Sequence, residues 1–199
     1  MPVKKYAPRH QTWPYNPSDF TRQDPSNDSQ FYSTPRFVTH IDDAAIDTLR
    51  QYYETVLPLK GKILDFCSSW VSHYPNPIET AAANGSLQII GMGMNKAELD
   101  ANQVLNSRIL KDLNTDPNIY TALQEANVID SSEESKLDSA TVVVSIDYLI
   151  EPVQVLSSLL DATKPSGTVH LTISNRCFPT KAISRWLRVD EEERLQMVG

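Results

Sequence analysis

The stretch Lys62-Ile-Leu-Asp-Phe-Cys-Ser-Ser-Trp70 decides the fold of this chain. Residues 62–66 form a short apolar run of the kind that makes a fully buried strand. In parallel sheets that bind a nucleotide-like ligand, the turn after such a strand normally contains glycines, which let the backbone approach the ligand closely. Cys67, Ser69 and Val71 stand at those places here. The stretch therefore indicates a fold more strongly than it indicates a ligand.

Helical patterns and apolar runs alternate outward from this strand. An amphipathic helix is expected over residues 40–56, with a polar surface loop at 131–139, a turn at 164–167 and an acidic helix at 190–197. Buried strands are expected at 62–66, 87–92, 108–110, 140–146 and 168–173, and helices at 78–83, 96–105, 117–126 and 152–162. Strands that alternate with helices in this way predict an α/β fold, a doubly wound and mainly parallel sheet with helices on both faces.

The 199 residues are enough for one domain with a substantial core, and the N-terminal part differs from the rest in composition. Residues 1–36 hold six of the thirteen prolines and no glycine, together with six aromatic residues. We expect residues 1–38 to form an extended arm whose aromatic side chains anchor it to an α/β domain at 39–199. A disordered leader is the alternative.

Charge and cysteine content exclude several classes of function. The formal net charge is -7, and after residue 40 there are 13 Lys and Arg against 22 Asp and Glu, which argues against nonspecific nucleic-acid binding. Only Cys67 and Cys177 occur, so no disulfide framework or Cys-rich metal site is expected. Helix capping explains the acidic pair after His40, so no metal is predicted there. No apolar run reaches the ~20 residues of a membrane span, and a cytoplasmic location is expected, with a nuclear one as the alternative.

Four segments resemble the class I S-adenosylmethionine-dependent methyltransferases, the small-molecule type in particular. They are residues 63–65, 89–95, 141–150 and 159–172, which are similar to the first, second, fourth and fifth strands with their turns. The Lys-Pro-Ser-Gly turn at 164–167 is the most specific match. The resemblance covers about residues 40–187 and implies a Rossmann-like methyltransferase fold with S-adenosylmethionine as cofactor. No sequence here resembles the last antiparallel strands of that family, so we expect either that the chain is a fragment or that the sheet has an open edge for a protein partner or a second copy.

The resemblance also implies site residues at the carboxyl ends of the strands. Cofactor contacts are expected from Asp65, Cys67, Ser68, Ser69, Met92, Gly93, Asn95, Asp112 and Ser145. Gly93 stands where a ribose-binding carboxylate is usual, and Asn95 is expected to replace it by hydrogen bonding. On the acceptor side we expect His73, Asp147 and Tyr148 as catalytic groups, and Asn175 with Arg176 to bind the substrate.

Each of these residues also has a structural interpretation. Cys67 is either a nucleophile with a lowered pKa or an inert packed thiol, and Trp70 either stacks on adenine or packs in the protein. The glycine-free turn can offer its amides to a ligand if it avoids positive φ. Two functions stay open: methyl transfer to an unidentified small molecule or protein, or an inactive methyltransferase fold that acts as a protein-interaction module. Backbone amides of residues 67–70 that converge on an open cavity would favour the first, and Trp70 or Tyr74 filling that cavity would favour the second.

Overall fold

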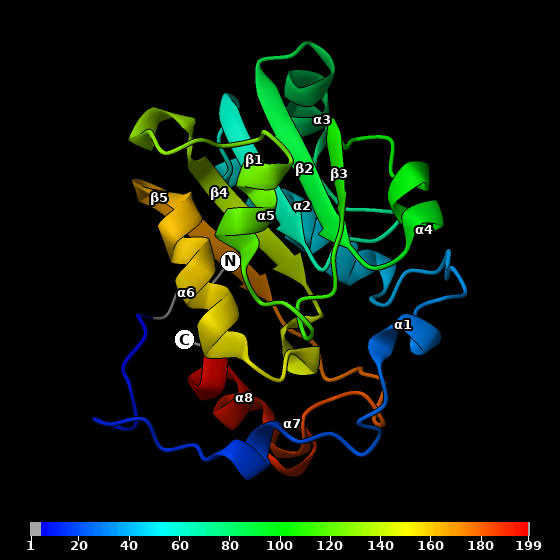
Figure 1. Ribbon diagram of the computed structural model, residues 1–199, viewed down its shortest axis with the longest axis vertical. Helices are drawn as coiled ribbons and strands as arrows, with labels where there is room; N and C mark the ends of the chain where they lie inside the picture. Colours follow the sequence, from blue (N-terminus) through cyan, green and yellow to red (C-terminus); the bar gives the residue numbers. More distant parts are fainter. Residues whose placement is uncertain (1–4, 199) are drawn as a thin grey trace.

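A five-stranded parallel sheet forms the centre of the computed structural model, which describes residues 5–198 (Figure 1). The strands are β1 (Gly61–Phe66), β2 (Leu87–Gly93), β3 (Ser107–Leu110), β4 (Leu137–Val143) and β5 (Thr163–Thr172). They lie in the order β3-β2-β1-β4-β5, and every neighbouring pair is parallel. The predicted doubly wound fold is therefore confirmed, and the strand order reverses between β1 and β4.

Helices cover both faces of the sheet. On one side lie α2 (Asp43–Val56), α3 (Asn76–Ala83) and α4 (Lys96–Ala101), and on the other α5 (Ile119–Glu125) and α6 (Pro152–Ala162). Within β1, Ile63 belongs to the core beneath α2 and α3, whereas Leu64 and Phe66 belong to the core beneath α5 and α6. Successive strand residues point to opposite faces, so a strand covered on both sides has to be apolar throughout.

A further layer lies at the carboxyl ends of the strands, at the bottom of Figure 1. It consists of the 3-10 helix η1 (Pro17–Phe20), α1 (Asp28–Phe31), α7 (Ser184–Arg188) and α8 (Glu191–Val198). The fully buried Lys181 ammonium lies 3.1 Å from Asp28 and 3.0 Å from Asp24, and Arg22 lies 2.7 Å from Asp28. The two ion pairs of Lys181 join the N-terminal and C-terminal segments. Residues 1–4 of the expected arm and residue 199 lie outside the described residues, and the division at residue 38 stays a prediction.

Several predicted boundaries were wrong. The helix expected over 96–105 ends at Ala101, where Asn102 leaves helical geometry and its side-chain amide donates to Ser69 O at 3.0 Å. The surface loop expected over 131–139 is partly strand, because β4 already begins at Leu137. Ser139 is fully buried there and its hydroxyl lies 3.2 Å from that of Thr168, so hydrogen bonding lets a polar residue occupy the sheet.

The turn expected at 164–167 is also different. β5 runs through it, but Thr163 pairs with Leu137 while Thr168 pairs with Ser139. Residues 164–167 therefore bulge out of register with β4. At the other end, β4 stops at Val143 instead of continuing to residue 146, because Val144 adopts a φ of 45°.

Within residues 5–198, β5 lies at one edge of the sheet and pairs with β4. The same residues contain no helix that is both long enough and apolar enough to span a membrane.

Candidate functional site

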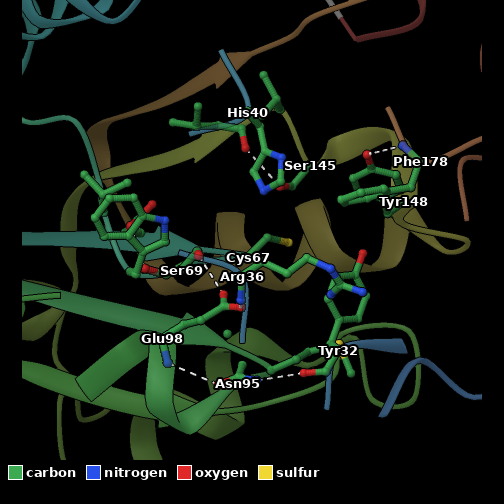
Figure 2. Close-up of a pocket in the computed structure, with 18 of the residues that line it drawn as sticks. Tyr32, Arg36, His40, Cys67, Ser69, Asn95, Glu98, Ser145, Tyr148 and Phe178 are labelled. Carbon is green, nitrogen blue, oxygen red and sulfur yellow. Dashed lines mark hydrogen bonds between the residues drawn. The ribbon is translucent and has the colours of Figure 1, made fainter. Parts of the chain in front are cut away.

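A cavity of about 350 Å³ lies beyond the carboxyl ends of the strands (Figure 2). Residues that follow each of the five strands line it, at 67–71, 93–95, 111–114, 144–145 and 176–178. Parallel α/β sheets bind their ligands at this position, where the strand order reverses. Its volume falls within the range of about 300–1,000 Å³ that small-molecule sites occupy.

Most of the predicted site residues meet in this cavity. Those that line it are Asp65, Cys67, Ser68, Ser69, His73, Gly93, Asn95, Asp112, Ser145, Tyr148 and Arg176. Met92, Asp147 and Asn175 do not. The Met92 side chain is fully buried in the core beside α5 and α6, and Asn175 is exposed to solvent.

Asp147 and Tyr148, both predicted as acceptor-side catalytic groups, do not face the same cavity. Both belong to the 3-10 helix η3 (Ile146–Tyr148), in which consecutive side chains point about 120° apart. Tyr148 faces the 350 Å³ cavity, whereas Asp147 lines a second cavity. The Tyr148 hydroxyl accepts a hydrogen bond from Phe178 N at 2.9 Å, and burial raises its pKa. It is therefore a protonated group in the cavity wall.

Asp65 holds the loop that follows β1. Its Oδ2 accepts hydrogen bonds from the hydroxyls of Ser68 at 2.7 Å and Ser72 at 2.6 Å, while Thr141 approaches Oδ1 at 3.4 Å. Asn102 extends the network by donating to Ser72 Oγ at 2.9 Å. Burial raises the pKa of Asp65 to about 6, and the three hydroxyls oppose that rise. Hydrogen bonds from these hydroxyls to the Asp65 carboxylate therefore hold this loop in place. In sheets that bind a nucleotide-like ligand, glycines normally form the corresponding turn.

The backbone of this loop is strained and lies directly on β2. Cys67 and His73 have φ values of 54° and 55°, so the condition under which the turn was expected to offer its amides, the avoidance of positive φ, is not met. The Ser68 amide donates to Met92 O at 2.8 Å and is not free for a ligand. A Cβ atom on Gly93 would lie 2.1 Å from Ser68 O. This close approach explains why a glycine stands where a carboxylate was expected.

The thiol and the aromatic residues of the loop keep the cavity open. Burial raises the pKa of Cys67 to about 12, so the thiol is uncharged at neutral pH and fits the inert interpretation. Trp70 donates from Nε1 to Val38 O at 3.1 Å, and its ring meets Phe37 edge-on. Tyr74 lies in the core, with its hydroxyl 2.7 Å from that of Thr141. Neither ring fills the cavity.

The N-terminal segment forms the opposite wall (Figure 2). Asn95 donates from its amide to Tyr32 O at 2.8 Å and Ser33 O at 3.2 Å, and its Oδ1 accepts from Glu98 N at 3.1 Å. Both amide hydrogens are therefore used within the protein, and none is left for a ribose. These contacts were not predicted, because residues 32 and 95 are distant in sequence and meet only through the fold.

Glu98 is a site residue that sequence reasoning missed. Its two carboxylate oxygens accept from Arg36 N at 2.7 Å and from Ser69 Oγ at 2.6 Å, on the cavity wall. A carboxylate has about four acceptor positions, so roughly two remain available. The Asn95-x-x-Glu98 spacing could have drawn attention to it, but that spacing is also typical of a helix start.

Three cationic residues border the cavity. The Arg36 guanidinium lies 4.5 Å from the centre of the Phe31 ring and donates from Nη2 to Phe31 O at 2.9 Å. Its Nη1 has no hydrogen-bond partner within residues 5–198. Lys111 pairs with Asp116, and Arg176 is exposed.

The carboxylate of Asp112 accepts hydrogen bonds from Asn114 N at 2.9 Å and Thr115 Oγ1 at 2.8 Å. These two bonds form a local turn.

Two imidazoles also line the cavity. Burial lowers the pKa of His73, and the charges of Arg50 and His40 lower it further. Burial lowers the pKa of His40 as well. Both are therefore neutral at neutral pH.

Ser145 donates its hydroxyl to Val143 O at 2.9 Å. In the part of the chain that the structure describes, no group of three His, Cys, Asp or Glu side chains is arranged to hold a metal ion.

Comparisons with known proteins concern the fold alone. The sequence matches no protein-family model and no curated protein. Similar solved structures include a SAM-dependent methyltransferase from Aquifex aeolicus, with 13% identity and a TM-score of 0.48 over 79% of this chain and 86% of that one. Another, from Archaeoglobus fulgidus, has 13% identity and a TM-score of 0.43 over 64% of this chain and 50% of that one. A third, from Geobacter sulfurreducens in complex with S-adenosyl-L-homocysteine, has 17% identity and a TM-score of 0.39 over 69% and 50%.

This chain spans about half the length of several of the structures that it matches. At such identities the likeness is one of fold and says nothing of ligand or reaction. The strand order and the parallel pairing by themselves establish the doubly wound α/β fold expected from the sequence.

Proposed function

We propose that the 350 Å³ cavity binds S-adenosylmethionine and that the chain transfers its methyl group to a small-molecule or protein acceptor. The observation that carries this proposal is the position of an open cavity where the strand order reverses, with residues from the ends of all five strands in its wall. The cofactor supplies a methyl group on a sulfonium, which is already a good leaving group. The protein has chiefly to align donor and acceptor.

Glu98 is the residue that we assign to the ribose hydroxyls. It lies in the first turn of α4, just beyond the end of β2, and its carboxylate keeps acceptor capacity after its bonds to Arg36 and Ser69. Neither Gly93 nor Asn95 has a free group for this task. Asp112 remains the candidate for the adenine amino group.

The remaining cavity residues would serve the charged tail and the acceptor. Arg36 and the exposed Arg176, which both line the cavity, suit a carboxylate of the cofactor or of the substrate. His73 is neutral, so it can take a proton from a methyl acceptor. Tyr148, which is protonated, can orient the acceptor by hydrogen bonding.

A second candidate function is a binding module without catalysis. It is favoured because the Ser68 amide and both Asn95 amide hydrogens are consumed inside the protein. In that case the cavity results from the fold and binds no cofactor. The open edge of β5 is then the surface that we would examine for a protein partner or a second copy. A cytoplasmic location likewise stays a prediction.

Calorimetric titration with S-adenosylmethionine and S-adenosylhomocysteine tests the first proposal. We expect micromolar binding that Glu98→Gln weakens about tenfold, the effect of losing about 1.4 kcal/mol. Glu151→Gln is the matched control, because Glu151 is exposed and lies outside the cavity, and it should bind as the wild type does. No binding up to about 1 mM would overturn the proposal and favour the non-catalytic module. Asp65 variants are unsuited to this test because Asp65 holds the loop.

A further inference from the structure

The N-terminal segment crosses the wall of the 350 Å³ cavity between two fixed points (Figure 2). At one end, Asp28 is 2% exposed and is held by two ion pairs. At the other end, Ile41 is buried in the core beneath α2 and α3. We call residues 32–38, which lie between these points, the strap. The strap residues that line the cavity are Tyr32, Arg36 and Val38.

Side chains of the sheet domain hold the strap in place. In the part of the chain that the structure describes, residues 34–41 make no backbone-to-backbone hydrogen bond. Instead, the Arg36 amide donates to Glu98 Oε1 at 2.7 Å, and Val38 O accepts from Trp70 Nε1 at 3.1 Å. Segments with few backbone hydrogen bonds and little buried apolar surface open at a lower free energy than the core of a protein does.

Glu98 joins the strap to the opposite wall of the cavity. Its second carboxylate oxygen accepts from Ser69 Oγ at 2.6 Å, in the loop after β1. Hydrogen bonds to a charged group are the stronger kind, so this carboxylate is the main polar attachment of the strap. Phe37 and Val38 are 52% and 55% exposed, so little apolar burial opposes the release of this part of the strap.

We propose that the strap opens and closes over the cavity while the sheet stays folded, and that Glu98 holds it closed. This opening is a property of the free protein. Only the choice of ligand rests on the proposed function: S-adenosylmethionine bound beneath the strap would keep it closed, because ligand and strap would then share Glu98.

Hydrogen exchange of the free protein tests the opening, and the Arg36 amide is the reporter because it is bonded to Glu98. Local opening exposes little surface, so exchange at Arg36 should barely respond to urea below the unfolding transition. Amides of the central strand β1 should respond with the slope of global unfolding. An Arg36 amide with the same urea slope as β1 would overturn the proposal. So would exchange as fast as in an unstructured peptide, because the strap would then not be closed.

A variant at a second attachment tests whether the strap opens as a unit. Trp70→Phe removes the donor to Val38 O but keeps an aromatic ring, and it should speed exchange of the Arg36 amide at least about threefold. Trp13→Phe is the matched control, because Trp13 lines the second cavity, and it should leave that exchange unchanged. Unchanged exchange in β1 shows that both variants are folded. An Arg36 exchange rate in Trp70→Phe equal to that of the wild type would overturn the proposal.

S-adenosylhomocysteine distinguishes this proposal from the proposed function. A ligand that binds only the closed strap should slow Arg36 exchange about tenfold at about ten times its Kd. Binding in the calorimeter without any slowing would overturn the role of the strap over the cavity. No binding up to about 1 mM would instead overturn the proposed function, whereas the opening of the strap is measured without a ligand.

Discussion

Two buried carboxyl groups, Asp65 in β1 and Asp147 just after β4, have opposite environments. Asp65 is surrounded by the hydroxyls of Ser68, Ser72 and Thr141, whereas Asp147 Oδ2 has no hydrogen-bond partner in residues 5–198. Burial raises the pKa of both, to about 6 and about 7 respectively. The hydrogen bonds of Asp65 stabilise the loop after β1. Asp147 Oδ2, by contrast, keeps hydrogen-bonding capacity that the protein does not use.

The largest expected effect concerns the pH dependence of stability at Asp147. Its pKa rises from 3.8 to about 7 on folding, so the folded protein holds this proton more tightly than the unfolded chain does. The free energy of unfolding should therefore fall as the pH rises from about 4 to about 7 and should not change further above that, by up to about 4 kcal/mol in total. Arg194, Tyr148 and Cys177 are the neighbouring titratable groups.

Urea unfolding of the wild type and Asp147→Asn at pH 5 and pH 8 measures this contribution. The variant cannot ionise at this position, so it should gain relative stability between the two pH values. A difference between the two proteins that does not change with pH would contradict the raised pKa, because Asp65 is common to both and cancels.

The next largest effect is expected when Asp65 loses a hydrogen-bond donor, so that its environment becomes more like that of Asp147. Ser72→Ala removes a 2.6 Å hydrogen bond from the buried carboxyl and leaves the Asn102 amide without that acceptor. We expect a loss of about 3 kcal/mol in the free energy of unfolding, measured with urea at pH 7. Ser145→Ala is the matched control, because its hydroxyl donates only to Val143 O, and it should lose less than about 1 kcal/mol. Equal losses in the two variants would show that the hydrogen bond of Ser72 to Asp65 contributes no more to stability than that of Ser145 to Val143 O.

A smaller effect is expected where the loop lies on β2. Gly93→Ala places a Cβ atom 2.1 Å from Ser68 O, so the loop has to move away from the strand. We expect a loss of about 2 kcal/mol, since overpacking typically costs about 1–3 kcal/mol. Gly85→Ala would meet no atom within 4 Å and serves to separate crowding from backbone strain, because its φ of 78° strains an alanine without crowding it. If Gly93→Ala has the same melting temperature as the wild type, the loop does not pack directly on β2.

The smallest effect is expected at the strained turn itself. Cys67→Gly relieves a φ of 54° but increases the freedom of the unfolded chain and removes a packed side chain. These effects oppose one another, so stability should change by less than about 1 kcal/mol in urea unfolding. Asn127→Gly, at a φ of 55°, is the comparison in which no core side chain is lost. A large loss for Cys67→Gly alone would show that the thiol packing, and not the Asp65 network, holds the loop.

The strands and helices of the sheet were largely predictable from local sequence. The helix expected at 152–162 has the same ends as α6, and the strand expected at 87–92 differs from β2 by one residue. Proline at the helix start and continuous apolar runs act over a few residues, so they are visible without the fold. The loop expected at 131–139 was partly wrong because the burial of Ser139 depends on Thr168, which is distant in sequence.

The candidate site was predictable in position but not in its hydrogen bonding. The sequence placed Asp65 and its following loop at the carboxyl end of the sheet, and the cavity lies there. It did not show that Glu98 meets Arg36 and Ser69, nor that Asp147 and Tyr148 face different cavities. These depend on which polar atoms find partners after the chain has packed.

By itself, the sequence determined a parallel α/β sheet with an unusual turn after its first strand, because hydrophobic periodicity and turn residues are local properties. Only the tertiary structure decided which polar groups are satisfied. The bonds of Asn95 to Tyr32 and Ser33 close one wall of the first cavity, and the packing around η3 leaves Asp147 Oδ2 without a hydrogen-bond partner in residues 5–198. Hydrogen bonding between residues far apart in sequence is set by three-dimensional proximity, which no local pattern encodes.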